Sequence, residues 1–218
     1  MSLDIQTYSV GPLETNCYLI SDTRTLESAL IDPGGPIREL GLGTGGSSEP
    51  PLSEGIGYII EYVLLTHGHP DHCFYAGEAA RDYRAAIAMH AADIEQIEQG
   101  LDIAAMFYDV SKFVAFSPTI LLNDGDQLRL GDSTIEVMHL PGHSRGGLGF
   151  VTAEGVFCGD TIFAGSIGRT DFPGGSYEEL ISSIRSRILT LKDETRLYPG
   201  HGPATTVGRE RKSNPFLT

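Results

Sequence analysis

The chain has few cysteines, no long apolar run and a shortage of basic residues. Three cysteines give no even disulfide framework, so we expect a reducing compartment, the cytoplasm. No stretch approaches the roughly 18 apolar residues of a membrane span, and the first residues lack the basic and apolar pattern of a signal peptide. Only 15 Lys and Arg face 29 Asp and Glu, and the net charge of −14 disfavours nucleic acid and anionic membranes as partners.

The remaining composition is that of an ordinary soluble protein, with 40% hydrophobic and 20% charged residues among 218 positions. A chain of this length can bury a substantial core, so a single domain is expected over residues 1–218. Strand-like and helical patterns alternate, which predicts a mixed α/β (α+β) fold. The expected strands are 5–10, 17–21, 28–32, 62–65, 86–90, 119–122, 127–130, 134–139, 148–152 and 155–158, and the expected helices are 74–84, 93–99 and 177–191.

The most informative segment is 67–72, which reads HGHPDH. Three imidazoles and a carboxylate would be costly to bury unpaired, whereas zinc, iron and manganese take both groups as ligands. The segment follows the apolar run 62–65, and a glycine and a proline break the strand where the polar residues begin. His67 and His69 are two apart, so in extended chain they point the same way. The spacing predicts a ligand cluster between a strand and a helix.

Three more candidate ligands follow apolar segments further along the chain. His143, Asp160 and His201 each come after a short strand-like run, and each is directly preceded by glycine. Glycine permits the sharp turns and close backbone approach that a crowded site needs. In layered α/β proteins, ligands collect at the carboxyl ends of strands. The repeated placement therefore predicts one shared site.

Taken together, these motifs resemble the metallo-β-lactamase superfamily, and more finely its single-domain, glyoxalase II-like (hydroxyacylglutathione hydrolase-like) branch. The resemblance runs from near residue 3 to 217 and is weaker over 37–57 and 100–118. It implies a four-layer αββα sandwich, the metallo-β-lactamase fold. Besides HGHPDH, the stretches that carry it are VGPLETNCY (10–18), IDPGG (31–35), GDTIF (159–163), GRTDFPGG (168–175), PGHGP (199–203) and NPFL (214–217).

The resemblance also assigns ligands for two divalent metal ions. His67, His69 and His143 would hold the first ion. Asp71, His72 and His201 would hold the second, and Asp160 would bridge the two. Zinc is expected first, and iron or manganese suits the same ligands.

The function that the resemblance implies is metal-dependent hydrolysis of a small-molecule thioester such as S-lactoylglutathione. A metal-bound hydroxide, present at neutral pH, would attack the acyl carbon, and Asp71 is the expected catalytic residue that orients it. Eukaryotic-type relatives carry a C-terminal helical extension that grips glutathione, whereas this chain ends soon after His201. Another ester, thioester or lactone therefore stays open as the substrate.

Other functions share parts of the same ligand set. The main alternative is an oxidoreductase, a persulfide dioxygenase with one Fe(II) held by His67, His143 and Asp160. A metal-binding module without catalysis and a diiron redox carrier are weaker alternatives. A nuclease is disfavoured by the acidic composition, and a periplasmic lactamase by the missing signal peptide. A homo-oligomer is left open.

Each residue near these motifs can be interpreted as structural or as functional. Arg145 and Arg169 are candidates for substrate binding, although Arg145 could equally be a solvated loop residue. For Arg169, a buried ion pair with Asp171 is the preferred interpretation. The remaining candidates are expected to be structural: His90, His139, Cys73, Cys158 and Tyr198.

Two segments have no clear periodicity. Residues 41–57 hold six glycines and two prolines and read as a flexible surface excursion. Residues 101–118 hold several aromatic side chains, which predicts with equal weight a loop that packs on the core and an aromatic lid beside the metals.

Overall fold

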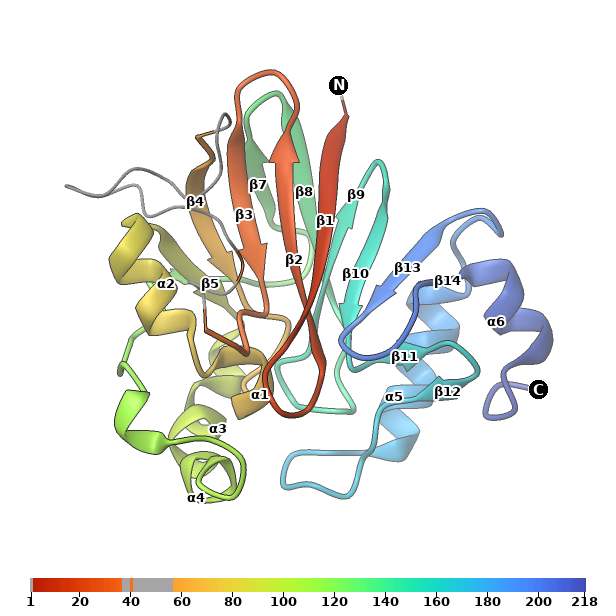
Figure 1. The fold of residues 1–218 in the computed structure, drawn as a ribbon. Helices are drawn as coiled ribbons and strands as arrows, with labels where there is room; N and C mark the ends of the chain where they lie inside the picture. The colour runs from red at the N-terminus through yellow and green to blue at the C-terminus, as the bar shows by residue number, and fades with distance from the viewer. Residues whose placement is uncertain (1, 37–39, 41–56) are drawn as a thin grey trace.

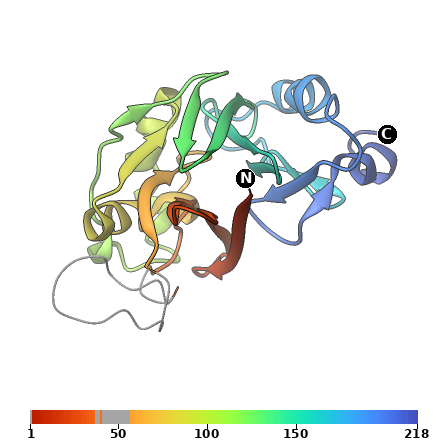
Figure 2. The same ribbon diagram turned by 90° about the horizontal axis from the view of Figure 1, so that it is seen from above.

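The computed structural model describes residues 2–36, 40 and 57–218, in which two six-stranded sheets lie face to face (Figure 1, Figure 2). The first sheet has the order β1 (Leu3–Val10), β2 (Thr15–Asp22), β3 (Glu27–Ile31), β4 (Ile59–Leu64), β5 (Ala86–Met89), β6 (Ile120–Leu121). The second has the order β14 (Thr205–Thr206), β13 (Arg196–Pro199), β10 (Gly155–Gly159), β9 (Leu148–Thr152), β8 (Ser133–His139), β7 (Gln127–Leu130). A small hairpin, β11 (Ile162–Phe163) and β12 (Ser166–Ile167), stands apart from both.

Helices cover the outer face of each sheet (Figure 2). On the first sheet lies α2 (Ala76–Tyr83). On the second lie α5 (Tyr177–Ser183), which continues into the π-helical turn η4 (Ile184–Ile188), and α6 (Val207–Ser213). The remaining short elements are α1 (Pro70–Cys73), η2 (Ala91–Asp93), α3 (Ile94–Gln99), α4 (Leu101–Ala104) and η3 (Val110–Lys112). Of these, α1, α3 and α4 lie below the strand ends of the first sheet (Figure 1). The four-layer αββα arrangement expected from the sequence is confirmed.

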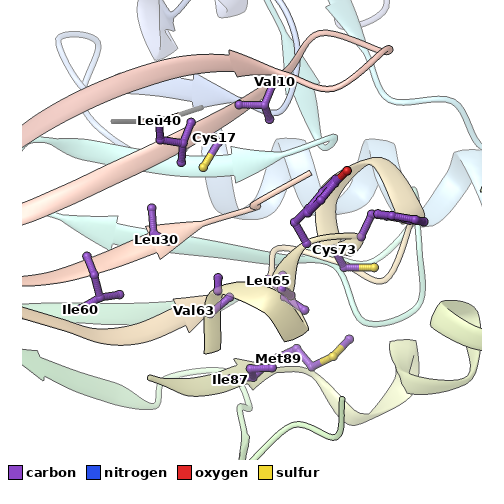
Figure 3. Close-up of a cluster of buried hydrophobic side chains, with 14 of the residues drawn as sticks. Val10, Cys17, Leu30, Leu40, Ile60, Val63, Leu65, Cys73, Ile87 and Met89 are labelled. Carbon is purple, nitrogen blue, oxygen red and sulfur yellow. The ribbon is translucent and has the colours of Figure 1, made fainter. Parts of the chain in front are cut away.

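Three apolar clusters separate these four layers. The first lies between the first sheet and its helices, the second between the sheets, and the third between the second sheet and α5, η4 and α6. Strand alternation divides the side chains among them: in β2, Cys17 and Leu19 face the first cluster, whereas Tyr18 and Ile20 face the second. Figure 3 labels these members of the first cluster: Val10, Cys17, Leu30, Leu40, Ile60, Val63, Leu65, Cys73, Ile87 and Met89.

A β-bulge in β4 corrects the alternation before the HGHPDH segment. Ser28 pairs with Ile60 and Ala29 with Tyr62, so Glu61 is an extra residue in the ladder. The bulge brings Ile60 onto the same face as Val63, although they are three residues apart. Beyond it, Val63 and Leu65 pack under the helices while Leu64 packs between the sheets. The strand therefore ends fully buried at the point where the histidines begin.

The helix expected over 74–84 is confirmed, within two residues at its start, as α2. The short helix α1 before it was not expected. It begins at Pro70, and proline is favoured there because the first turn of a helix leaves its N–H groups unbonded. The helix over 177–191 is confirmed, with its second half π-helical. The prediction for 41–57 falls, for 41–56, outside the described residues. None of the described helices has the length and hydropathy that a bilayer span requires.

The two predictions for 101–118 each hold for part of the segment. Phe113 and Phe116 pack against the first cluster as a core loop would. Met106 and Phe107 are exposed and line a large cavity, as expected of a lid.

Truncation of Phe150 tests the packing between the sheets. This β9 side chain is fully buried in the second cluster, so Phe150→Ala should lower the free energy of unfolding by about 3–5 kcal/mol. The matched control is Ile59→Ala, at a half-exposed position in β4, which should change it by less than about 0.5 kcal/mol. Urea unfolding measures both, and equal effects would contradict the assigned layers.

Candidate metal centre

The seven predicted ligands all lie where strands of the two sheets end. β4 ends just before His67, and α1 carries Asp71 and His72. In the second sheet, β8, β10 and β13 run in one direction and end before His143, Asp160 and His201 respectively. Strand ends from both sheets therefore meet beside α1 (Figure 1).

Glycines before the ligands allow the chain to turn and approach closely. Gly159 has a φ of +48°, the left-handed region, directly before Asp160. A Cβ on Gly200 would lie 2.2 Å from Asp160 Oδ1 and 2.6 Å from His72 Cε1. The backbone before His201 can thus lie against the other ligands only because Gly200 has no side chain.

One group of three histidines closes around a common point. His143 Nε2 lies 2.8 Å from His69 Nδ1 and 3.2 Å from His67 Nε2. The ligand nitrogens of all three lie within 4.8 Å of one another. This first group joins the loop after β4 to the loop after β8.

A second group contains Asp71, His72 and His201. Asp71 Oδ2 lies 3.1 Å from His201 Nε2 and 3.4 Å from His72 Nε2. Thr15 Oγ1 also donates a hydrogen bond to Asp71 Oδ2, at 3.3 Å. These three ligand atoms again lie within 4.8 Å of one another.

Asp160 lies between the two groups. Its Oδ1 is 3.4 Å from His72 Nε2, and its Oδ2 is 3.6 Å from His143 Nε2 and 3.7 Å from His201 Nε2. One carboxylate therefore reaches both groups. Among the described residues, Asp160 Oδ1 and His72 Nε2 are buried polar atoms with no hydrogen-bond partner.

Hydrogen bonds behind the histidines set which ring nitrogen faces inward. His72 Nδ1 donates to Asp32 Oδ2 at 2.9 Å, and His143 Nδ1 donates to the carbonyl of Arg169 at 2.7 Å. Thr66 Oγ1 donates to Asp32 at 2.6 Å, so His67 Nδ1, 3.0 Å from Thr66 Oγ1, donates to that oxygen. When neutral, each of these three rings therefore presents the lone pair of its Nε2 to the site.

Asp93 ties together the loops of the first group. It is fully buried, accepts from Ser144 Oγ at 2.6 Å and from the backbone N–H of Gly146 at 2.6 Å, and also accepts from the Gly68 N–H at 3.2 Å. Gly68 separates His67 from His69, and Ser144 follows His143. Asp93 therefore fixes the distance between the two loops without facing the site.

The loop of His201 is held by the β1–β2 hairpin. Asn16 Nδ2 donates to the carbonyls of Pro199 and Gly202 at 3.0 and 2.8 Å. The Asn16 N–H donates to the carbonyl of Gly200 at 2.7 Å. This fixed loop places His201 against the second group.

The charges around the histidines suit cation binding. Burial first, then His143, lowers the pKa of His69 to about 3, and burial first, then His72, lowers the pKa of His67 well below its ordinary value. Both rings are thus neutral at pH 7, with lone pairs free for a metal. Burial acts to lower the pKa of His72, yet the surrounding carboxylates raise it well above its ordinary value. The second group therefore favours positive charge.

The donor set fits two divalent ions. Neutral imidazoles and ionised carboxylates are ligands for zinc, iron and manganese. His67, His69 and His143 would hold one ion, and Asp71, His72 and His201 the other. The unpartnered Asp160 Oδ1 and His72 Nε2 gain partners in that arrangement. A third group, Asp32 with His67 and His72, is also close enough, but the oxygens of Asp32 already accept hydrogen bonds.

Sequence reasoning missed the supporting carboxylates. Asp32 follows an apolar strand run, as His143, Asp160 and His201 do, but its glycines come after it, in Pro-Gly-Gly, rather than directly before it. Asp93 has no such signal, because its partners come from distant loops that meet only in the folded chain.

The two arginines predicted to bind substrate are both exposed. The predicted ion pair of Arg169 with Asp171 exists, with both nitrogen–oxygen distances 2.7 Å. Its predicted burial is wrong: the two side chains are 56% and 68% exposed, because the pair lies on the rim of the cavity rather than inside the wall. Arg145 is also exposed, outside the residues that line the cavity, and its contact with a substrate stays a prediction.

The residues expected to be structural pack as expected. His90 and His139 stack at the ends of β5 and β8, with ring centroids 4.6 Å apart. Cys73, Cys158 and Tyr198 are buried.

A cavity of about 830 Å³ opens onto both groups. Five of the seven predicted ligands line its floor: His69, Asp71, His143, Asp160 and His201. A small molecule in this cavity can therefore reach the space between the groups.

Comparison with known proteins agrees with this arrangement. Residues 10–201 match the family model of the metallo-beta-lactamase superfamily. The chain belongs to the metallo-beta-lactamase superfamily. Members of this superfamily bind divalent metal ions, often two.

Individual members give the comparison more detail. The chain is 37% identical to the hydroxyacylglutathione hydrolase GloC of Haemophilus influenzae, over 99% of this chain and 98% of GloC. Among solved structures, TTHA1623 in a di-iron-bound form is 34% identical with a TM-score of 0.81, covering 97% of this chain and 100% of its own. The BLEG-1 B3 metallo-beta-lactamase is 29% identical with a TM-score of 0.81, covering 99% of this chain and 100% of its own.

Replacement of Asp93 tests the support of the first group. In Asp93→Asn, an N–H₂ group replaces one carboxylate oxygen and faces groups that themselves donate hydrogen bonds. The bonds between Asp93 and the two histidine loops are then lost, and the loops should move apart. We expect metal affinity to fall about 10- to 100-fold. Competition with a chromogenic chelator measures it. The matched control is Glu95→Gln, an exposed position two residues away, and equal affinities in the two variants would contradict the role of Asp93.

Proposed function

We propose that this member of the superfamily is a metal-dependent hydrolase that cleaves small-molecule thioesters. The observation that carries the proposal is the position of Asp160 between two complete ligand groups at the floor of an open cavity. The similarity to GloC, a hydroxyacylglutathione hydrolase, supports the thioester and makes S-lactoylglutathione the first compound to assay. Zinc is the first metal to test, followed by iron and manganese, because the ligand types suit all three.

The proposed ligands have separate tasks. His67, His69 and His143 would hold the first ion, and Asp71, His72 and His201 the second, with Asp160 shared. When bound, divalent ions would supply hydroxide at neutral pH and polarise the acyl carbonyl. Seven ligands from both sheets would fix those ions at the cavity floor.

Asp71 is the proposed catalytic residue. Burial acts to raise its pKa, but the charge of His72 and the hydrogen bond from His201 lower it below its ordinary value. Asp71 therefore stays ionised at neutral pH and can accept a hydrogen bond from the attacking water. The hydroxyl of Thr15 donates to one of its oxygens and holds it in place.

A thioester suits a site with this composition. A thiol with a pKa of about 8.5 leaves as a thiolate with little need of protonation. An amine leaving group would need a proton donor aimed at it. Cleavage of a thioester thus requires only activation of water and of the carbonyl.

Two other activities should be measured beside thioester cleavage. The similarity to BLEG-1 makes a chromogenic β-lactam the second compound to test. Persulfide oxidation would need only His67, His143 and Asp160 as iron ligands, and oxygen uptake on glutathione persulfide measures it. Two metals per chain, thioester cleavage and no oxygen uptake would support the proposal. Oxygen uptake with one iron per chain would overturn it.

Asp71→Asn tests the catalytic role directly. Loss of the charge should weaken both the orientation of water and the second metal site, lowering kcat for thioester cleavage at least about 100-fold. The matched control is Asp102→Asn, on the exposed side of α4, which should retain full activity. Metal content measured alongside separates lost binding from lost chemistry. A near wild-type kcat in Asp71→Asn would exclude the role.

A further inference from the structure

The wall of the cavity above the candidate metal centre is mostly apolar, with Gln96, Gln99, Ser166 and Arg169 among its polar side chains. Polar ligands occupy its floor, whereas side chains from the β1–β2 hairpin, α4 and its following turn, β11, β12 and the turn before α5 form the walls. The apolar side chains among these are Leu13, Ile103, Ala104, Met106, Phe107, Phe163, Ile167, Phe172 and Pro173.

The rim exposes large apolar side chains to solvent. Met106 is 69% exposed, Phe107 48%, Ile103 46% and Leu13 40%. All four line the same cavity. Contiguous exposed apolar surface of this kind is uncommon on soluble proteins unless it binds something. Methionine adapts its shape to an apolar partner at little cost.

Positive charge for an anionic substrate is scarce on this wall. Apart from the histidines at the floor, Arg169 is the one basic residue among the described residues that line the cavity. Both its Nε and its Nη2 donate to the carboxylate of Asp171, and its guanidinium lies 3.9 Å from the centroid of the Phe172 ring. The charge of Arg169 is therefore already paired.

Glutathione is a poor match for such a wall. It carries two carboxylates, which proteins bind with free Arg or Lys side chains. The net charge of −14 also repels an anionic molecule at a distance. An apolar acyl group, in contrast, would bury the exposed side chains of the rim and release water from them.

We propose that the preferred substrate is a thioester with an apolar acyl chain on a thiol without carboxylates. This inference rests on the proposed thioester hydrolysis and narrows its substrate class. The acyl chain lies along Ile103, Met106 and Phe107, with the carbonyl at the floor.

Four thioesters separate the two parts of the proposal. Lactoyl and hexanoyl groups are each joined to glutathione and to N-acetylcysteamine, and kcat/KM is measured for all four with the zinc-loaded protein. We expect hexanoyl to exceed lactoyl at least about ten-fold on either thiol, since each buried methylene adds to binding. N-acetylcysteamine should exceed glutathione with either acyl group. The reverse order on both axes would overturn the inference and leave thioester hydrolysis intact.

A rim variant tests the location. Phe107→Ser should lower kcat/KM for S-hexanoyl-N-acetylcysteamine about ten-fold and kcat/KM for S-lactoyl-N-acetylcysteamine, whose acyl group is short, less than about two-fold. The matched control is Val110→Ser, which is an exposed apolar position in the same segment but outside the cavity wall, and it should match the wild type with both. Equal effects of the two variants would overturn the location.

A binding measurement separates failure of this inference from failure of the proposed function. Calorimetry with two thioethers that cannot be hydrolysed, S-hexyl-N-acetylcysteamine and S-hexylglutathione, needs no catalysis. We expect the first to bind at least about ten-fold tighter, with a negative heat-capacity change. Binding in this order without cleavage of any thioester would sustain the apolar pocket and exclude the proposed hydrolysis. No binding of either thioether would exclude the apolar pocket.

Discussion

Two kinds of buried carboxylate meet at the shared edge of the sheets, and the difference between them organises the site. Asp32 and Asp93 accept hydrogen bonds from backbone N–H groups, hydroxyls and, for Asp32, an imidazole. Asp160 instead keeps an oxygen without a partner, next to His72 Nε2 in the same state. A buried charge has to be compensated by partners. Asp32 and Asp93 have theirs within the protein and support the structure, whereas Asp160 has an oxygen left without one at the centre of the site. A pair of divalent cations there would satisfy it.

The sequence predicts which candidate ligands come together better than it predicts the residues that support them. Five histidines and two aspartates at strand ends could be recognised because metal chemistry restricts residue type and spacing, and the structure brings all seven together. Alternation also predicts the strands, since each face of both sheets is buried against a different layer. The extra residue Glu61 in β4 escapes this reasoning, because a bulge depends on the neighbouring strand. The role of Asp93 escapes it for the same reason: Ser144 and Gly146 are some fifty positions away.

The floor of the cavity is polar and its rim is apolar, and the two parts suit different functions. Its floor is built from loops that follow strands in the two sheets, where strand ends hold side chains rigidly. Its rim comes largely from 101–108, where exposed Met106 and Phe107 continue a chain segment whose later aromatics, Phe113 and Phe116, pack on the core. The segment is thus anchored at one end and open at the other. A rigid floor suits chemistry common to the superfamily, and an apolar rim suits selection among substrates.

Anomalous X-ray diffraction from crystals of the zinc-loaded protein would test the central claim most directly. Two anomalous peaks per chain are expected, one among His67, His69 and His143, and the other among Asp71, His72 and His201, with the Asp160 carboxylate touching both. A single peak, or peaks away from Asp160, would contradict it.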